Sequence, residues 1–405
     1  MKNLFDIKAK KPIYFDYAAS TPIDPLVLKS MYPILEKYYA NTMSIHSLGQ
    51  ESKDLLEKTR DGFAKLLKVN SGEIIFTGSA TESNNFVIKG IAYAHKNLGN
   101  HVIVSNIEHA CILNSAKWLE KKGYKVDYLS VDQNGIINLE ELKNLITDDT
   151  VLISIIHVNN EIGVIEPIEK VGKLINEIKE NRINRKIETP LYFHTDASQS
   201  FGKIDININK ISCDLLTLSS HKVYGPKGAS LLYIKKGTKI SPLIHGGGQE
   251  FGFRSSTVNT PAIFGFYKAC ELALKRQKQD YQKASKLKTK IIKTLQSKLQ
   301  NCYLNGSINT QVPQIISLRF DFVEGESLVY LLDTNNICVS SASACASLSL
   351  SPSHVLLSLG LKPEQAHGTI RISIGRYTTN EDVNYLLKVL PDIVNKLRNI
   401  SPFKA

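Results

Sequence analysis

The sequence predicts an α/β protein: a large, mainly parallel sheet domain covered by helices, followed by a smaller α+β domain. From about residue 50 to 270, helical stretches alternate with short β-rich runs, which is the pattern of parallel strands joined by helices. A long polar amphipathic segment, Pro261–Leu299, then ends the alternation. Beyond it, strands and helices follow in mixed order. We therefore expect a large domain over 12–260 and a smaller one over 261–405.

Composition and apolar runs place the chain among globular proteins. Of its 405 residues, 42% are hydrophobic and 22% are charged, which argues against a largely disordered chain. Apolar runs such as Val151–Ile156 fall far short of the roughly 18 residues that a membrane span needs. We therefore expect no membrane partner.

The large domain opens with an extended arm and then alternates helices with strands. Pro12–Tyr17 reads as extended, Thr21–Pro25 is a turn that feeds a helix, and the arm of about residues 12–30 is expected to return to the smaller domain. The expected helices are Gln50–Leu67, Glu82–Lys96 and Leu113–Lys122. The expected strands are Glu73–Phe76, His101–Val104, Lys125–Tyr128, Val151–His157, Leu191–His194 and Leu215–Leu218.

The smaller domain mixes both kinds of element. Its expected strands are Gln314–Phe320, Val329–Leu332 and Thr369–Ile374. Its expected helices are Ser353–Leu359 and Glu381–Leu397. Apolar residues recur at helical spacing along the last of these, which predicts core packing, with a partner on its outer face as the alternative.

The chain carries an excess of positive charge. Lys and Arg number 50 against 38 Asp and Glu, a formal net charge of +12 that can attract acidic partners. The lysines are dispersed through helical stretches such as Lys283–Lys298, and no nucleic-acid-binding motif accompanies them. We expect a solvated surface and no direct nucleic-acid partner, with steering of an anionic partner as the alternative.

The cysteines of the chain indicate the redox state of its compartment. There are six, at positions 111, 213, 270, 302, 338 and 345. Without a Cys-x-x-Cys pair or a histidine at metal-ligand spacing, a disulfide scaffold and a structural zinc site are disfavoured. Free thiols predict a reducing compartment. Met1–Lys11 lacks the apolar core of a secretory signal. We expect a cytoplasmic protein, with a short presequence for a mitochondrion or a mitochondrion-derived organelle as the alternative.

Two motifs that follow expected strands carry groups suited to an anion and a charged ring. Thr77–Ser83 opens a helix, where hydroxyls and backbone N–H groups can bind a phosphate; a plain N-cap by Ser79 or Thr81 is the alternative. In the second motif, Asp196 comes just past a buried strand, where a carboxylate needs a partner. It can hold a protonated pyridine nitrogen, and Gln199 can donate to a phenolic oxygen. A helix N-cap by Asp196 is the alternative.

Two further motifs carry a lysine and a cysteine. Lys222 follows an apolar strand, between small residues, a histidine and a Gly/Pro loop, which suits an amine that forms a Schiff base. An ordinary surface charge is the alternative. Cys345 lies in Ser340–Ser347, a run of small hydroxyl-bearing residues without apolar periodicity. The run predicts a mobile loop with an accessible thiol, and an incidental cysteine in a linker is the alternative.

Taken together and in order, these motifs resemble the signature of the cysteine desulfurases, pyridoxal-phosphate enzymes of the class V aminotransferase type. The segments that carry the resemblance are Thr77–Ser83, Glu108-His109, His157–Gly163, His194–Gln199, Ser219–Lys222 and Arg254–Thr257. Ser340–Ser347 with Pro352–Leu356 is similar to the long active-site loop of the branch that serves iron–sulfur assembly. The resemblance is collinear from about Tyr14 to Ser401.

The resemblance implies a homodimeric fold-type-I enzyme that converts L-cysteine to L-alanine. It implies delivery of persulfide sulfur from Cys345, on a mobile loop over 338–352, to an iron–sulfur scaffold protein, to a tRNA-thiolation acceptor, or to both. A transient 2Fe–2S contact of Cys345, shared with the scaffold, is implied by the same analogy. Lys222 would carry pyridoxal phosphate, and His109 would stack over its ring and serve as acid or base.

Further binding residues are implied in the same way. Asp196 would pair with the pyridinium nitrogen and Gln199 would face the phenolic oxygen. The positions that match the phosphate cradle are Ala80, Thr81, Ser219 and His221, with Thr257 from the neighbouring subunit. Asn160, which also matches a cofactor-binding position, and Arg371 would hold the substrate carboxylate.

Arg371 is also singled out by its position within an expected strand. It lies between apolar neighbours, where an unpaired arginine is costly, and its planar fork suits a carboxylate. Arg376 is the nearest rival and is expected at the surface.

Several positions depart from the family pattern. Gly78 and Ser79 stand in reversed order, and Ser220, Ser256 and Ala342 replace residues that are often glycine. A side chain restricts the backbone, so a position that needs positive φ would impair cofactor binding or loop closure.

Other classes of function stay open beside sulfur transfer. One is a different pyridoxal-phosphate reaction on this fold, such as transamination or selenocysteine lysis. The presence of Cys345 distinguishes sulfur transfer from transamination, since a transaminase has no need of a thiol on this loop. The other is a non-catalytic scaffold relative, against which absorbance of a bound cofactor would count.

Overall fold

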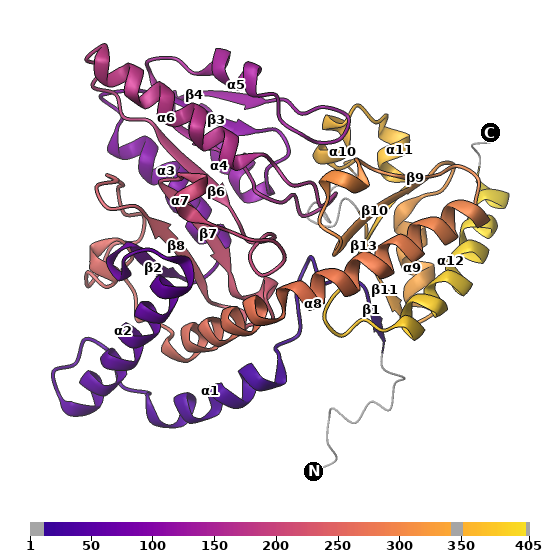
Figure 1. The fold of residues 1–405 in the computed structure, drawn as a ribbon, viewed down its shortest axis with the longest axis horizontal. Helices are drawn as coiled ribbons and strands as arrows, with labels where there is room; N and C mark the ends of the chain where they lie inside the picture. The colour runs from indigo at the N-terminus through magenta and orange to yellow at the C-terminus, as the bar shows by residue number, and fades with distance from the viewer. Residues whose placement is uncertain (1–11, 342–350, 402–405) are drawn as a thin grey trace. The chain divides into compact units, whose positions relative to one another are not determined.

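The computed structural model describes residues 12–341 and 351–401, which form two compact units (Figure 1). The larger unit comprises Ser20–Asn160 and Val164–Lys278. The smaller unit comprises Glu161–Gly163 together with the segments before Ser20 and from Gln279 onward. The domain boundaries expected at 12–260 and 261–405 stay a prediction.

A seven-stranded sheet forms the centre of the larger unit, in the order β2-β8-β7-β6-β5-β3-β4. Its strands are β2 (Ile74–Thr77), β3 (His101–Ser105), β4 (Lys125–Leu129), β5 (Thr150–Ser154), β6 (Tyr192–Asp196), β7 (Leu215–Ser219) and β8 (Ser230–Ile234). The strands β4, β3, β5, β6 and β7 pair in parallel, while β8 is antiparallel to both of its neighbours. The predicted large, mainly parallel sheet is therefore confirmed.

Helices cover both faces of this sheet, as the parallel connections require. They are α1 (Pro25–Lys37), α2 (Ser47–Leu67), α3 (Ala80–Ala94), α4 (Ala110–Glu120), α5 (Leu139–Leu145), α6 (Ile168–Asn184), α7 (Ile208–Ile211) and the first half of α8 (Thr260–Lys298), with short 3-10 turns η1 (Ser71–Glu73), η2 (Ser220–Lys222) and η3 (Glu250–Gly252). Apolar residues of α3 and α4 pack on one face, and those of α2, α6, α7 and α8 pack on the other. The sheet is thus buried between two apolar layers.

The smaller unit is built on an antiparallel sheet in the order β12-β13-β10-β9. Its strands are β9 (Cys302–Leu304), β10 (Ile315–Phe320), β12 (Ser340–Ser341) and β13 (Thr369–Ser373), and β1 (Ile13–Tyr14) pairs separately in parallel with β11 (Ile337–Cys338). Its helices are α9 (Gly325–Asp333), α10 (His354–Ser358), α11 (Pro363–His367), α12 (Asn380–Ile400) and the 3-10 turn η4 (Ile308–Thr310). The expected core packing of the last helix is confirmed, because Val383, Leu386 and Leu390 are fully buried.

One predicted strand is wrong. Val329–Leu332 lies within helix α9, in which Leu328 and Leu332 are fully buried and Tyr330 is 69% exposed. Burial at positions four residues apart is the helical period. An apolar run of four residues fits either element, so its length alone could not decide.

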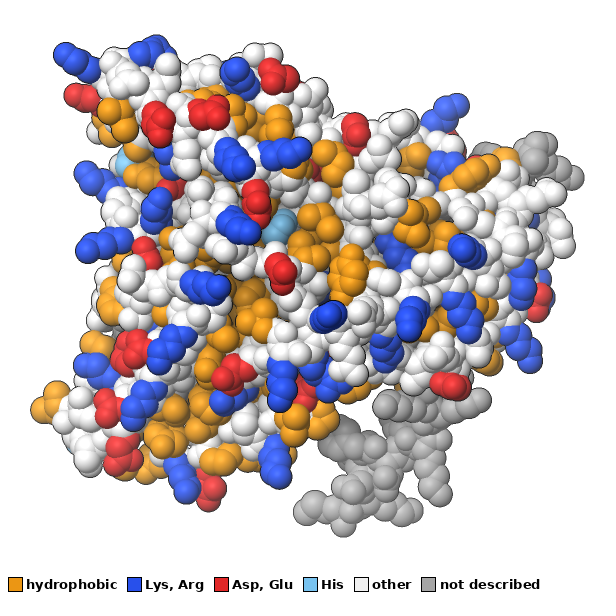
Figure 2. All heavy atoms as spheres, in the orientation of Figure 1, with side chains coloured by type: hydrophobic (Ala, Val, Ile, Leu, Met, Phe, Trp, Pro, Cys, Tyr) orange, Lys and Arg blue, Asp and Glu red, His pale blue; other side chains and the backbone are white. Residues whose placement is uncertain are grey.

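Two surface properties follow from the described residues. Within them, no helix is long and apolar enough to cross a membrane. On the face shown in Figure 2, Lys and Arg side chains are scattered among acidic and neutral ones rather than gathered in one patch. This distribution agrees with a solvated, mixed surface.

Candidate active site

The predicted cofactor residues follow the strands of the large sheet. The strands β3, β5, β6 and β7 run in one direction, and β2 shares it because both β2 and β7 are antiparallel to β8. Their carboxyl ends therefore meet at one edge, where open α/β sheets bind ligands. The segments that start there carry Thr81, His109, Asn160, Asp196 and Lys222.

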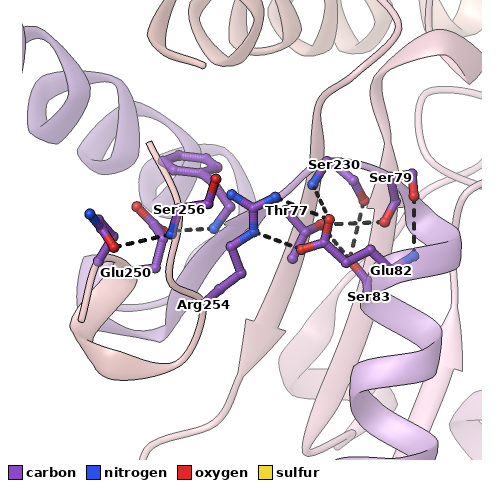
Figure 3. Close-up of polar contacts among 11 residues, drawn as sticks. Thr77, Ser79, Glu82, Ser83, Ser230, Glu250, Arg254 and Ser256 are labelled. Atoms are coloured by element: carbon purple, nitrogen blue, oxygen red, sulfur yellow. Dashed lines mark hydrogen bonds and ion pairs between the residues drawn. The ribbon is translucent and has the colours of Figure 1, made fainter. Parts of the chain in front are cut away.

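The first segment forms a turn between β2 and α3. Ser79 caps α3 by accepting a hydrogen bond from the Glu82 N–H at 3.1 Å, and the Glu82 carboxylate accepts one from the Gly78 N–H at 2.9 Å (Figure 3). The N-cap alternative is therefore confirmed for Ser79. Ala80 and Thr81 form the first turn of the helix, whose N-terminal dipole favours an anion. Capping and phosphate binding are compatible, because they use different groups.

A loop that carries Thr257 is tied to this turn by ion pairs. Arg254 donates through Nε to Glu82 Oε1 at 2.7 Å (Figure 3). The positive charge of Arg254 balances the negative charge of this carboxylate beside the turn. Glu250 accepts from Arg60 Nη1 on α2 and from the Phe76 N–H of β2, both at 2.8 Å. These contacts hold the loop against α2, β2 and α3. Thr257 itself is exposed.

Asp196 ends β6 and is 5% exposed. It accepts hydrogen bonds from Asn84 Nδ2 at 2.7 Å and from the Ser198 N–H at 2.9 Å. Turns rather than a helix follow it, so Asp196 caps no helix. Gln199, in one of these turns, is 3% exposed and accepts from Lys203 Nζ at 2.6 Å. Two donors orient the carboxylate at the strand end.

The segment with Lys222 is the turn η2, directly after β7. Ser219 Oγ lies 3.2 Å from His221 Nδ1. Burial, together with the positive charges of Lys222 and Lys227, lowers the pKa of His221 to about 4. His221 is therefore neutral near pH 7 and can donate or accept a hydrogen bond without adding charge.

His109 and Asn160 lie on the segments that follow the neighbouring strands β3 and β5. His109 caps α4, and its Nδ1 accepts a hydrogen bond from the Cys111 N–H at 3.2 Å. Asn160 is 8% exposed, and its segment is held to the end of β6 by a hydrogen bond from the His157 N–H to the Asp196 carbonyl at 3.0 Å. Both residues therefore sit on backbone that the sheet fixes.

Two predicted residues belong to the smaller unit. Arg371 lies on β13, is 5% exposed and pairs through Nη2 with Asp16 Oδ1 at 2.9 Å. Cys345, with its proposed metal contact, lies outside the described residues, as does most of the expected loop over 338–352. The smaller unit therefore shows one of these two residues, as a buried and already paired guanidinium.

The expected surface position of Arg376 is wrong. It is 6% exposed, because the turn after β13 places its guanidinium against α8, where Nε is 3.0 Å from Asp280. The pairing satisfies a buried charge, as the Asp16 pairing does for Arg371.

Two residues that sequence reasoning missed join the predicted ones. Asn84 bridges Asp196 to Cys111, since its Nδ2 also lies 3.3 Å from Cys111 Sγ. Cys111 stands two residues after His109, in the first turn of α4. Among the described residues, no three His, Cys, Asp or Glu side chains are grouped so that they could hold a metal ion.

Comparison with known proteins places the chain in a family. The class-V aminotransferase model matches residues 13–386. The cysteine desulfurase IscS of Dictyoglomus turgidum is 44% identical over 395 residues, which cover 98% of each chain. The chain belongs to the cysteine desulfurases. IscS of Clostridium botulinum is similar at 45% identity, over 97% of this desulfurase and 96% of that protein.

Solved structures agree with this family. A NifS-like protein superposes with a TM-score of 0.87 at 36% identity, over 95% of this desulfurase and all of that chain. A structure titled SspA in complex with cysteine gives a TM-score of 0.77 at 35% identity, over 90% of this desulfurase and 99% of that chain. The shared fold is that of the fold-type-I pyridoxal-phosphate enzymes.

Pyridoxal phosphate is the cofactor of this family, and the residues at the sheet edge fit it. They offer an amine, a buried carboxylate, and hydroxyls beside a helix N-terminus, which are the groups the cofactor needs. In addition, Ser198 Oγ, Ser220 Oγ and Asn84 Oδ1 are buried and have no hydrogen-bond partner among the described residues. Buried polar atoms of this kind point to a polar ligand.

Proposed function

We propose that Cys345 of this cysteine desulfurase takes the sulfur of L-cysteine, leaving L-alanine, and passes it on as a persulfide. The acceptor we propose is an iron–sulfur scaffold protein, with tRNA thiolation as a second destination, because 340–347 resembles the loop of that branch. The observation that carries the proposal is the buried Asp196 carboxylate, held as an acceptor at the sheet edge that also presents Lys222. The pyridoxal phosphate that these groups suit supplies an electron sink for the substrate carbon.

Each residue at the edge has a proposed task. Asp196 keeps the ring nitrogen protonated, and Gln199 faces the phenolic oxygen. Lys222 would hold the cofactor, and its amine would move protons at the substrate carbon. His109 gives or takes a proton beside it. Ala80, Thr81, Ser219, His221 and the partner subunit's copy of Thr257 hold the phosphate, while Asn160 and Arg371 hold the substrate carboxylate.

The sulfur step balances without an outside oxidant. The Cys345 thiolate attacks the substrate sulfur and forms an S–S bond, while the bond between that sulfur and the substrate β-carbon breaks. The electron pair of the broken bond stays with the carbon fragment, which takes up protons and becomes alanine. An acceptor thiolate or a reductant then removes the outer sulfur from Cys345.

An exposed apolar surface supports the proposed homodimer. Large apolar side chains are exposed on α1 and just after it, among them Leu26 at 61%, Tyr32 at 63%, Leu35 at 54%, Tyr39 at 74% and Ile45 at 95%. Apolar side chains gathered on one element are typical of a protein interface. A second copy is the partner we propose, which would also bring Thr257 to the neighbouring site.

Sedimentation tests the dimer. We expect twice the chain mass for the holoenzyme and a shift toward the single-chain mass for Tyr32→Lys with Leu35→Lys, because charges would be buried unpaired. Tyr330→Lys, at a side chain 69% exposed in the smaller unit, is the matched control and should leave the mass unchanged. A wild-type protein that sediments as one chain would contradict the proposal.

The reaction is tested with purified holoenzyme, L-cysteine and a thiol reductant. Wild type should release sulfide and alanine in equal amounts, and Cys345→Ser should lose sulfide release by at least about a hundredfold because the attacking thiolate is gone. Cys302→Ser removes another thiol, buried in the smaller unit, and serves as the control. Equal sulfide release by wild type and Cys345→Ser would refute Cys345 as the nucleophile.

The proposed compartment is reducing, and we propose the cytoplasm or, for a chain with a presequence, a mitochondrion-derived organelle. The cysteines of the described part, Cys111, Cys213, Cys270, Cys302 and Cys338, are all free thiols. Free thiols persist where glutathione and thioredoxin keep them reduced.

A further inference from the structure

Cys111 lies against the imidazole that the proposed function uses as acid or base. Helix α4 begins at Ala110, and His109 caps it through Nδ1, which accepts the Cys111 N–H at 3.2 Å. The Sγ of Cys111 lies 3.1 Å from the same Nδ1. One nitrogen of the ring thus faces two groups of Cys111.

The other side of the thiol is fixed by Asn84. Asn84 Nδ2 donates to Asp196 Oδ2 at 2.7 Å and to Cys111 Sγ at 3.3 Å. Both hydrogen bonds use the N–H groups of the amide, so Asn84 is the donor on this side. The sulfur therefore accepts from Asn84, and its own hydrogen is available for His109 Nδ1.

The thiol keeps its hydrogen at physiological pH. Burial, and next the negative charge of Asp196, raise the pKa of Cys111 to about 12, although hydrogen bonds from Asn84 and Thr81 act the other way. A thiol in this state is a donor and a poor nucleophile. It can orient a neighbour without competing with Cys345 for the substrate sulfur.

We propose that Cys111 is a positioning residue, whose S–H group donates to Nδ1 of His109 and holds the neutral imidazole with its proton on Nε2. The inference rests on the proposed acid–base role of His109. Nδ1 then accepts from two donors, the S–H and the backbone N–H of Cys111, which disfavour a proton on Nδ1 itself. Nε2 is therefore the nitrogen that exchanges protons with a substrate. The chain Asp196–Asn84–Cys111–His109 also links the carboxylate proposed for the ring nitrogen to that imidazole.

The test compares holoenzyme with wild-type Cys111, Cys111→Ser and Cys111→Ala, all labelled with ¹⁵N-histidine. The ring nitrogen shifts report the tautomer directly, whether or not the enzyme turns over. We expect the Nε2–H form in wild type and in Cys111→Ser, which keeps a donor. In Cys111→Ala we expect a mixture, and the ring should take up its second proton about half a pH unit higher, because one donor to Nδ1 is lost.

Activity gives the second readout. The acid limb of the kcat/KM profile should move to higher pH in Cys111→Ala and return toward wild type in Cys111→Ser, because serine keeps a donor to Nδ1. Unchanged ring shifts and an unchanged acid limb in Cys111→Ala, with cofactor absorbance intact, would overturn the proposal. The expected shifts in a wild type that forms no alanine would support the positioning of His109 and refute the proposed reaction instead.

Discussion

Ser256 has a backbone conformation that L-residues rarely adopt. Its φ is +134°, and its N–H donates to Gln249 Oε1 at 3.0 Å beside the Arg254–Glu82 ion pair (Figure 3). The sequence places a serine here where glycine is common in the family, and the structure shows that the position does require positive φ. Ser220 and Gly78 do not share this property. The strain lies next to Thr257, at the loop that Glu250 and Arg254 hold in place.

Replacing Ser256 by Gly should therefore stabilise the protein. Removing the side chain relieves the strain of positive φ, and the gain should exceed the added chain entropy of glycine by about 1 kcal/mol. Urea unfolding of the cofactor-free protein measures the difference. Ser256→Ala is the control, because it removes the hydroxyl and keeps the strain. Equal stabilisation by Ala and Gly would show that strain is not the cause.

Single residues also mark how far sequence predicts the site. Thr81, Asp196 and Lys222 could be predicted because each directly follows a strand, and parallel strands end at one edge. Asn84 and Cys111 could not, because their contacts depend on how α3 and α4 are placed on the sheet. The same holds for Arg376, whose partner Asp280 lies 96 residues away along the chain.

At the scale of elements, periodicity predicts those elements that have one amphipathic face or a clear alternation with helices. Helices α2 and α12 and strands β3, β5, β6 and β7 were predicted to within a few residues. Strand β8 was not, because it is antiparallel and its five residues are all buried. It therefore shows no alternation and no crossover helix. The strand predicted at Val329–Leu332 was wrong because a run of four apolar residues fits the period of a strand as well as that of a helix.

At the scale of the whole molecule, buried ionisable groups make stability depend on pH. Glu166 is 2% exposed, and its Oε2 accepts from the Ile137 N–H at 3.1 Å. Burial raises its pKa from 4.5 to about 8; the hydrogen bond from Ile137 opposes this, and the charge of Asp132 adds to it. Burial also lowers the pKa of His157 and His194 to about 4. These histidines lower stability as the pH falls from about 6.5 toward 4.

Glu166 acts in the opposite direction. Its pKa is higher in the folded state than in the unfolded chain, so its stabilisation is complete below about pH 4.5 and is lost as the pH rises through about 8. Glu166→Gln keeps the acceptor for Ile137 and cannot ionise. Between pH 5 and 8, the free energy of unfolding of wild type should therefore fall relative to this variant by about 1 kcal/mol per pH unit.

Urea unfolding of both proteins at several pH values measures that difference. Both proteins contain His157 and His194, so the contribution of these histidines to the free energy of unfolding cancels. Glu140→Gln, at an exposed carboxylate in the first turn of α5, is the matched control and should show no such slope. A difference between wild type and Glu166→Gln that stays constant from pH 5 to 8 would mean that Glu166 ionises alike in both states. The native fold would then admit water to this carboxylate, and the pH dependence of the molecule would have to come from its other buried groups.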